Sequence, residues 1–278
     1  HSDIVAEQVD INHELSLVQN DLLQVKSDIV RLNSISGKGA SVWLDAIPYN
    51  LSLRMCDDEY TTAIRLRFGI ELDDFYYQPN FLKPICVLCN KLFESSTHPL
   101  VCRMEHRRTQ NDRHNYVVSV IHQQLNRYKV STQKEYMAFK NDPMAEYQQL
   151  RPDLYINSCT SATPLVCDVV VSHPSAPSYI ERASRNPGSV THDNETRKTT
   201  KYRPPISRSR CVFYPIALES YGYIGPLTRK LIKYLHEHSN HTYDQQLHPW
   251  KVSFPNMLIQ HISVAIQKGN ARCIGLSY

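Results

Sequence analysis

The sequence predicts an α/β protein in which buried strands and helices follow a long N-terminal helix. Residues 4–32 carry apolar side chains at helical spacing. Two apolar runs, 164–171 and 211–218, are typical of buried strands, and Pro215 favours an edge or a bulge for the second of them. Further helical patterns lie between and after these strands, at 57–68, 112–128, 226–236 and 254–268.

Composition sets wide limits on the class of protein. The chain has 278 residues, 41% hydrophobic and 21% charged, as is ordinary for a folded globule. The net charge of +4 is small, so a basic surface for nucleic acid would have to be local. No run of about 18 apolar residues is present, and we expect no membrane span. We expect three segments, at 1–36, 37–110 and 111–278.

The N-terminal helix has the spacing of a heptad repeat. From Ile11 to Leu32 the apolar positions alternate in steps of four and three, and Gln8 interrupts the pattern before them. Two interpretations stay open. The helix pairs with another helix or a larger upstream body, or it is an ordinary amphipathic surface helix. The glycines at 37 and 39 end it.

Four potential metal ligands occur within 17 residues: Cys86, Cys89, His98 and Cys102. Thiolates and an imidazole at this spacing indicate a tetrahedral Zn²⁺ knuckle. A closed set of four ligands would be structural, because it leaves no position for water. The alternative is a coincidence of buried cysteines. The other cysteines are scattered, which suits a reducing compartment.

Two aspartates are the candidate catalytic pair. Asp153 follows Pro152, so its backbone is extended or turning, and Asp168 lies at the front of an apolar, β-branched run, with fourteen residues between the two acids. Two carboxylates on neighbouring strands can bind a hard divalent cation such as Mg²⁺. Such a metal can activate water against a phosphodiester. The alternative is that Pro152 and Asp153 mark a surface turn and Asp168 is an edge-strand charge.

A basic stretch precedes the helix at 112–128 and is the candidate nucleic-acid contact. It lies beside the predicted zinc knuckle, and its alternative is a solvated charged loop. With Arg151, the residues assigned to this surface are Arg107, Arg108, Arg113 and His114. His114 could instead face an active site or simply be a surface histidine. A strand within 128–139 would carry Glu135, and the polar residues 172–196 are predicted to be a loop or partly disordered insert.

Taken in order, these motifs resemble a known family. The cysteine–histidine knuckle, Arg113-His114-Asn115, Arg151-Pro152-Asp153, Asp168 and a Lys-x-x-Lys-Tyr stretch at 198–202 are similar to the restriction-like endonuclease domain that follows the reverse transcriptase in some non-LTR retrotransposon polyproteins. The resemblance covers about residues 37–275. It implies a PD-(D/E)xK nuclease core in segment 111–278, with a mixed sheet flanked by helices.

The resemblance also implies a function and partners. Asp153 and Asp168 would bind catalytic Mg²⁺, and the knuckle would bind structural Zn²⁺. The product would be nicked DNA whose 3′ hydroxyl primes reverse transcription, in the nucleus, with element RNA as a second partner. No Tyr-x-Asp-Asp signature is present, and the chain begins at His1, so we expect any polymerase to lie upstream.

One position departs from the family pattern. The lysine expected two residues after the second acid is Val170 here. Lys198 or Lys201 would replace it from a helix, and the sequence does not choose between them. Glu135 is a further candidate acid near the metal. Two other functions stay open: a catalytically inactive zinc-containing module that binds nucleic acid, and a scaffold assembled through the N-terminal helix.

Overall fold

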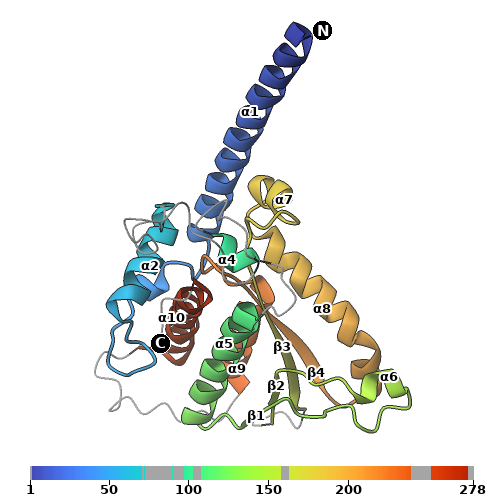
Figure 1. Ribbon diagram of the computed structural model, residues 1–278. Coiled ribbons are helices and arrows are strands. Elements are labelled where there is room, and N and C mark those ends of the chain that lie inside the picture. The colour runs from blue at the N-terminus through green and yellow to red at the C-terminus, as the bar shows by residue number, and fades with distance from the viewer. Residues whose placement is uncertain are drawn as a thin grey trace.

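The structure is a computed structural model of the chain. It describes residues 2–70, 72, 89, 97–102, 108–157, 163–238 and 252–274, with only the backbone of residues 2–16, 108 and 109. The described part is mixed α/β, and helices flank a four-stranded sheet (Figure 1). Within it, no helix combines the length and the apolar character needed to cross a membrane.

The sheet is mixed. Its strands lie in the order β1 (Thr132–Lys134), β2 (Leu154–Ile156), β3 (Leu165–Ser172) and β4 (Val212–Glu219). β1 pairs antiparallel with β2, β2 antiparallel with β3, and β3 parallel with β4. The strands predicted near 164–171 and 211–218 are confirmed. β4 lies at the edge of the sheet, where the missing N–H of Pro215 is tolerated.

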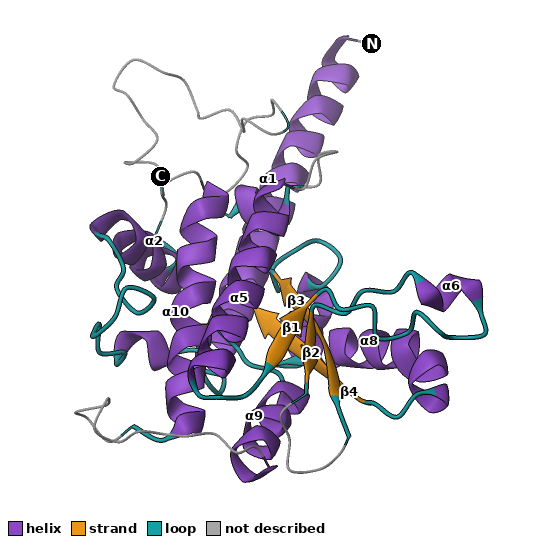
Figure 2. Cartoon of the chain, turned by 90° about the horizontal axis from the view of Figure 1, so that it is seen from below, coloured by secondary structure: helices purple, strands orange, loops and turns teal. Residues whose placement is uncertain are grey.

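Different helices cover the two faces of β3 (Figure 2). Cys167 and Val169 point into the main core, formed with α5 (Arg108–Arg127), α9 (Pro226–His238) and α10 (Phe254–Ile274). Val166 points to the other face, against Tyr202 of α8 (Ser189–Arg208). Because side chains alternate along a strand, Asp168 faces α8 as well.

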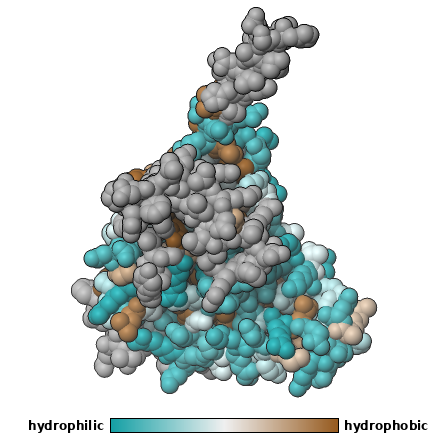
Figure 3. All heavy atoms as spheres, in the orientation of Figure 1, coloured by the Kyte–Doolittle hydropathy of each residue, from teal (hydrophilic) through white to brown (hydrophobic). Residues whose placement is uncertain are grey.

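The N-terminal helix α1 (Ser2–Ile35) projects from the globular part, and only its C-terminal end packs there (Figure 1). Val30 contacts α7 (Ile180–Arg185), and Ser34 donates a hydrogen bond to Glu219. The helix predicted at 4–32 is thus confirmed. Its heptad positions Val18, Leu22 and Val25 are 54–64% exposed, and Figure 3 shows apolar residues on its surface.

The remaining helices are short. The helix at Asp57–Phe68, α2, is ended by Gly69, as predicted, and this glycine has the left-handed conformation with φ of 69°. The bounds of these short elements are η1 (Val42–Leu44), α2 (Asp57–Phe68), α4 (His98–Val101) and α6 (Ala145–Gln148).

The prediction of a loop or disordered insert at 172–196 is wrong. This segment contains α7 and the first part of α8, and Gly188 in the left-handed conformation separates the two helices. α8 buries polar residues that show no apolar periodicity. Asn194 donates hydrogen bonds to Val190 O and Ser172 Oγ, and Glu195 accepts one from the N–H of Leu227. Their polar groups are paired, so they can be buried.

The predicted helix end at residues 269–270 is also wrong, because α10 continues to Ile274. Gly269 is required by close packing. A Cβ atom there would lie 2.7 Å from the Arg113 side chain. Asn270 is buried and donates a hydrogen bond to Ser220 O, so it stabilises the helix instead of ending it.

Candidate functional site

Asp168 lies on β3 facing two side chains of α8. Lys198 forms an ion pair with its Oδ2 atom, and the Tyr202 hydroxyl donates a 3.1 Å hydrogen bond to Oδ1. Lys198 and Tyr202 are four residues apart, which places them on the same face of α8. The Asp168 side chain is only 7% exposed, so both carboxylate oxygens are held inside the protein.

Asp153 lies beside Asp168 at the end of the neighbouring strand. Leu154 pairs with Cys167, and continuing this antiparallel register by one residue sets Asp153 opposite Asp168. The Asp153 Oδ2 atom accepts a 2.6 Å hydrogen bond from the N–H of Val169. It also lies 3.2 Å from Nε2 of His114, which comes from α5. Two strands and two helices therefore meet at this acidic pair.

The pKa values reflect this crowding. Burial raises the pKa of Asp168 above its ordinary value, and the charge of Asp153 raises it further, against the opposing effect of Lys198. Burial alone would lower the pKa of His114, but its hydrogen bond with Asp153 and the charge of that acid outweigh burial and raise it. Burial, with Asp168 beside it, raises the pKa of Tyr202, so its hydroxyl stays protonated.

The structure distinguishes between the two candidate lysines. Lys198 contacts the acid directly. Lys201 is exposed, and its Nζ atom lies 5.0 Å from the centre of the Tyr202 ring. Its charge still lowers the pKa of Asp168 to a minor extent. Glu135 follows β1, and its N–H donates a 3.3 Å hydrogen bond to Asp153 O while its side chain is exposed.

The predicted nucleic-acid contacts separate into different environments. The prediction that Arg113 contacts nucleic acid is wrong. Arg113 is 2% exposed, and its guanidinium donates hydrogen bonds to Asn270 Oδ1 and Val171 O inside the protein. It anchors α5 to α10 and β3 and lies where no phosphate can reach. Arg151 is exposed, as a surface contact requires. Arg107 and the side chain of Arg108 lie outside the described residues.

Two participants in the site are not among the catalytic residues predicted from the sequence. The sequence places His114 among the nucleic-acid contacts, with an active-site position as an alternative, and in the structure its ring lies against Asp153 and 3.2 Å from the carbonyl oxygen of Val169. The sequence signal for His114 was its position at the start of a helix that packs on the predicted strands. The backbone of Val169 also faces the site, and a backbone group leaves no signal in a sequence.

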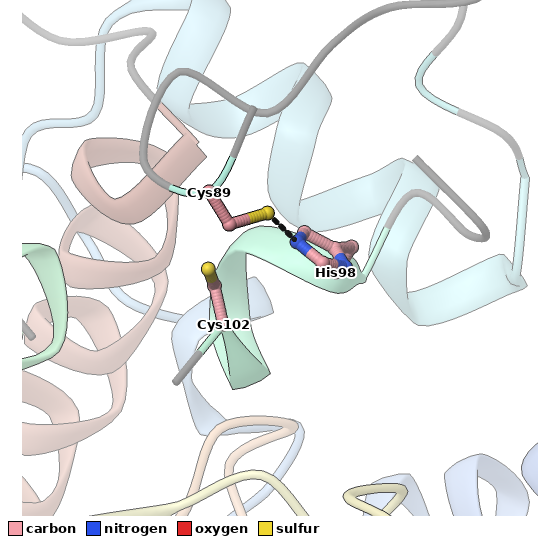
Figure 4. A group of neighbouring side chains, drawn as sticks. All are labelled: Cys89, His98 and Cys102. Carbon is pink, nitrogen blue, oxygen red and sulfur yellow. Dashed lines mark hydrogen bonds between the residues drawn. The ribbon is translucent and has the colours of Figure 1, made fainter. Parts of the chain in front are cut away.

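A second cluster brings together Cys89, His98 and Cys102 (Figure 4). Their ligand atoms all lie within 4.8 Å of one another, and Cys89 Sγ is 3.2 Å from His98 Nε2. His98 begins α4 and Cys102 directly follows it, so this single turn presents both to Cys89. The cluster could hold a metal ion. The fourth predicted ligand, Cys86, lies outside the described residues.

Removing one thiol from this cluster should abolish its metal binding. Two thiolates and an imidazole are the ligands that Zn²⁺ prefers, so we expect dialysed wild-type protein to retain about one zinc per chain and Cys102→Ser to retain almost none. Atomic emission measures both. Cys56→Ser is the matched control, because Cys56 is exposed and outside the cluster. Equal zinc in wild type and Cys102→Ser would rule out the site.

No protein-family model matches the chain, and no curated protein sequence matches it significantly. The fold and the site define an α/β protein in which two acids meet a lysine and a histidine from flanking helices, at the point where β2 stops pairing with β3.

Proposed function

We propose that the chain is a Mg²⁺-dependent DNA endonuclease that hydrolyses one phosphodiester bond, with a restriction-endonuclease-like core. The observation that carries the proposal is the convergence of Asp153, Asp168 and Lys198 at one end of the β2–β3 pair. Two acids and a lysine are the equipment for metal-assisted attack of water on a phosphate ester. The exposed Arg151 precedes Asp153 and supplies a positive charge for the DNA backbone.

The acidic pair fits a divalent metal. The charge of Asp153 raises the pKa of Asp168, so the two carboxylates repel each other, and a bound cation would relieve that repulsion. Asp153 and Asp168 would hold the Mg²⁺. The metal, when bound, supplies an activated water and neutralises charge on the phosphate. Lys198 provides a fixed positive charge, and Tyr202 holds the second oxygen of Asp168.

The position of the lysine accounts for the departure from the family pattern. Val170 occupies the place where the pattern has its lysine, and it follows Asp168 on β3 by two residues. A lysine there would project from the strand on the same face as Asp168. Lys198 extends from α8, which covers that face of the sheet, and forms the ion pair with Asp168. An equivalent charge can therefore be supplied without the strand position.

The resemblance also suggests the biological setting. We propose that the chain belongs to a retrotransposon-derived protein that acts on DNA in the nucleus, with a reverse transcriptase upstream in the same polyprotein and element RNA as a second partner. The metal cluster at Cys89, His98 and Cys102 would be a structural zinc site beside the nuclease core.

A plasmid assay tests the proposed activity. Purified protein should convert supercoiled DNA to the open circle with Mg²⁺ and lose this activity in EDTA. A protein that binds DNA with steep salt dependence but leaves it intact at every Mg²⁺ concentration would be the inactive binding module instead.

The two lysines offer a matched pair of variants. Lys198→Ala should lower the nicking rate constant about 100-fold, because it removes a positive charge held on the acidic pair. Lys201→Ala should lower it less than about tenfold, since Lys201 is exposed and contacts a tyrosine ring. Single-turnover rates at saturating Mg²⁺ measure both, with circular dichroism to verify folding. A larger loss for Lys201→Ala would reverse the assignment.

A further inference from the structure

Three potential metal ligands of different chemistry meet on the β2 side of β3. The Nε2 atom of His114 lies 3.2 Å from Asp153 Oδ2 and 3.2 Å from the carbonyl oxygen of Val169. The three groups come from α5, the turn before β2, and β3. Such a convergence of an imidazole, a carboxylate and a carbonyl is a donor set for a first-row divalent metal.

The sheet topology explains why a backbone carbonyl is included. β2 pairs with β3 only as far as Cys167. The backbone N–H and C=O groups of Val169 therefore lie beyond the part of β3 that pairs with β2. The N–H and C=O of one strand residue face the same neighbour. Asp153 accepts that N–H, which places the Val169 carbonyl oxygen next to the carboxylate.

The histidine is held firmly in place. Arg113, one residue before it, is buried and binds Asn270 and Val171 O, which fixes the first turns of α5 against α10 and β3. On the other side of the ring, His114 Nδ1 lies 3.2 Å from Asn115 Oδ1. In the tautomer whose Nδ1–H donates a hydrogen bond to Asn115 Oδ1, Nε2 presents a lone pair to Asp153 Oδ2 and to the Val169 carbonyl oxygen. A cation bound between these three atoms would accept all three lone pairs and remove the repulsion among them.

The spacing suits a metal as well. Ligands about 2.1 Å from an octahedral ion and at right angles to each other are about 3.0 Å apart. The two observed separations of 3.2 Å are close to this value. The same distances also fit a hydrogen bond in which His114 only orients Asp153, and the experiment below separates the two roles.

We propose that Nε2 of His114 and the carbonyl oxygen of Val169 join the Asp153 and Asp168 carboxylates as metal ligands, and that this nitrogen gives the site a preference for Mn²⁺ over Mg²⁺. Mg²⁺ favours oxygen ligands, whereas imidazole favours the later first-row metals. The inference rests on the proposed nuclease site and specifies which divalent ion that site selects.

Pulsed electron paramagnetic resonance tests the ligand directly. Zinc-loaded wild-type protein with one equivalent of Mn²⁺ should show coupling from a directly bound ¹⁴N nucleus, and labelling the histidines with ¹⁵N should replace that signal. His114→Gln should lose it, because an amide side chain can still donate a hydrogen bond to Asp153 but brings no imidazole nitrogen. His122→Gln is the matched control, since His122 lies on α5 and contacts Thr132 instead.

Calorimetry supplies a second readout. His114→Gln should weaken Mn²⁺ binding about tenfold or more and change Mg²⁺ binding much less. Bound Mn²⁺ without nitrogen coupling in the wild type would overturn the inference, as would an unchanged preference in His114→Gln. The labelling result stands even if the variant fails to fold. Nitrogen coupling without DNA nicking would reject the proposed nuclease alone, and nicking without coupling would reject the ligand alone.

Discussion

Asp153→Asn should reduce Mg²⁺-dependent nicking about 1,000-fold or more while the protein stays folded. The substitution removes the charge of one of two carboxylates that would hold the metal, and the loss of a bound metal removes several kcal/mol of transition-state stabilisation. Folding should survive because the asparagine carbonyl can still accept the hydrogen bond from the N–H of Val169. Single-turnover nicking of a supercoiled plasmid measures the rate, and thermal unfolding measures the fold.

Asp112→Asn is the control for this result. Asp112 is exposed near the start of the same helix as His114, so the change alters the net charge equally without touching the acidic pair. We expect its rate to stay within about threefold of the wild type, since exposed charges are screened by salt. Equal nicking by Asp153→Asn and wild type would remove Asp153 from the chemistry and with it the paired-acid site.

The predictable part of the fold is the part with apolar periodicity. Strand β3 was predicted from its apolar residues, and α1 and α2 from spacing and glycine ends. α8 was missed at its start because Asn194 and Glu195 are buried through hydrogen bonds to residues far along the chain. No local pattern reveals such partners. The helix end predicted at Gly269 is wrong for a related reason, because the glycine is needed for close packing against Arg113 and does not end the helix.

The candidate site was predictable as a set of residues but not as a set of contacts. Asp153 and Asp168 were named together, and the register of β2 and β3 sets them opposite each other. The choice of Lys198 over Lys201 needed the orientation of α8, which the sequence does not give. Arg113 was assigned to the wrong environment from the sequence. A basic residue beside a basic stretch is expected on the surface, and only the structure shows that it is buried.

The contribution of one buried acid to the stability of the chain should fall with rising pH. Glu219 is 2% exposed and accepts a 2.6 Å hydrogen bond from Ser34, and burial raises its pKa from the ordinary 4.5 to about 7. The folded protein therefore keeps this proton up to about pH 7, whereas the unfolded chain releases it near pH 4.5. Over that interval the contribution of Glu219 to the free energy of unfolding should fall, by about 3 kcal/mol in total.

Glu219→Gln isolates this contribution, because glutamine stays neutral and its carbonyl still accepts the hydrogen bond from Ser34. Urea unfolding of both proteins between pH 4.5 and 8 should give similar stabilities at the acid end and a variant more stable by about 3 kcal/mol at pH 8. Ionisations that both proteins share cancel in this difference. Glu237→Gln, on the exposed side of α9 with only a surface ion pair to Lys233, should follow the wild type within about 0.5 kcal/mol. A Glu219→Gln profile parallel to that of the wild type would show that the carboxyl ionises at the same pH in the folded and unfolded protein, so that above this pH the contact between α1 and β4 would contain a buried charge instead of a proton.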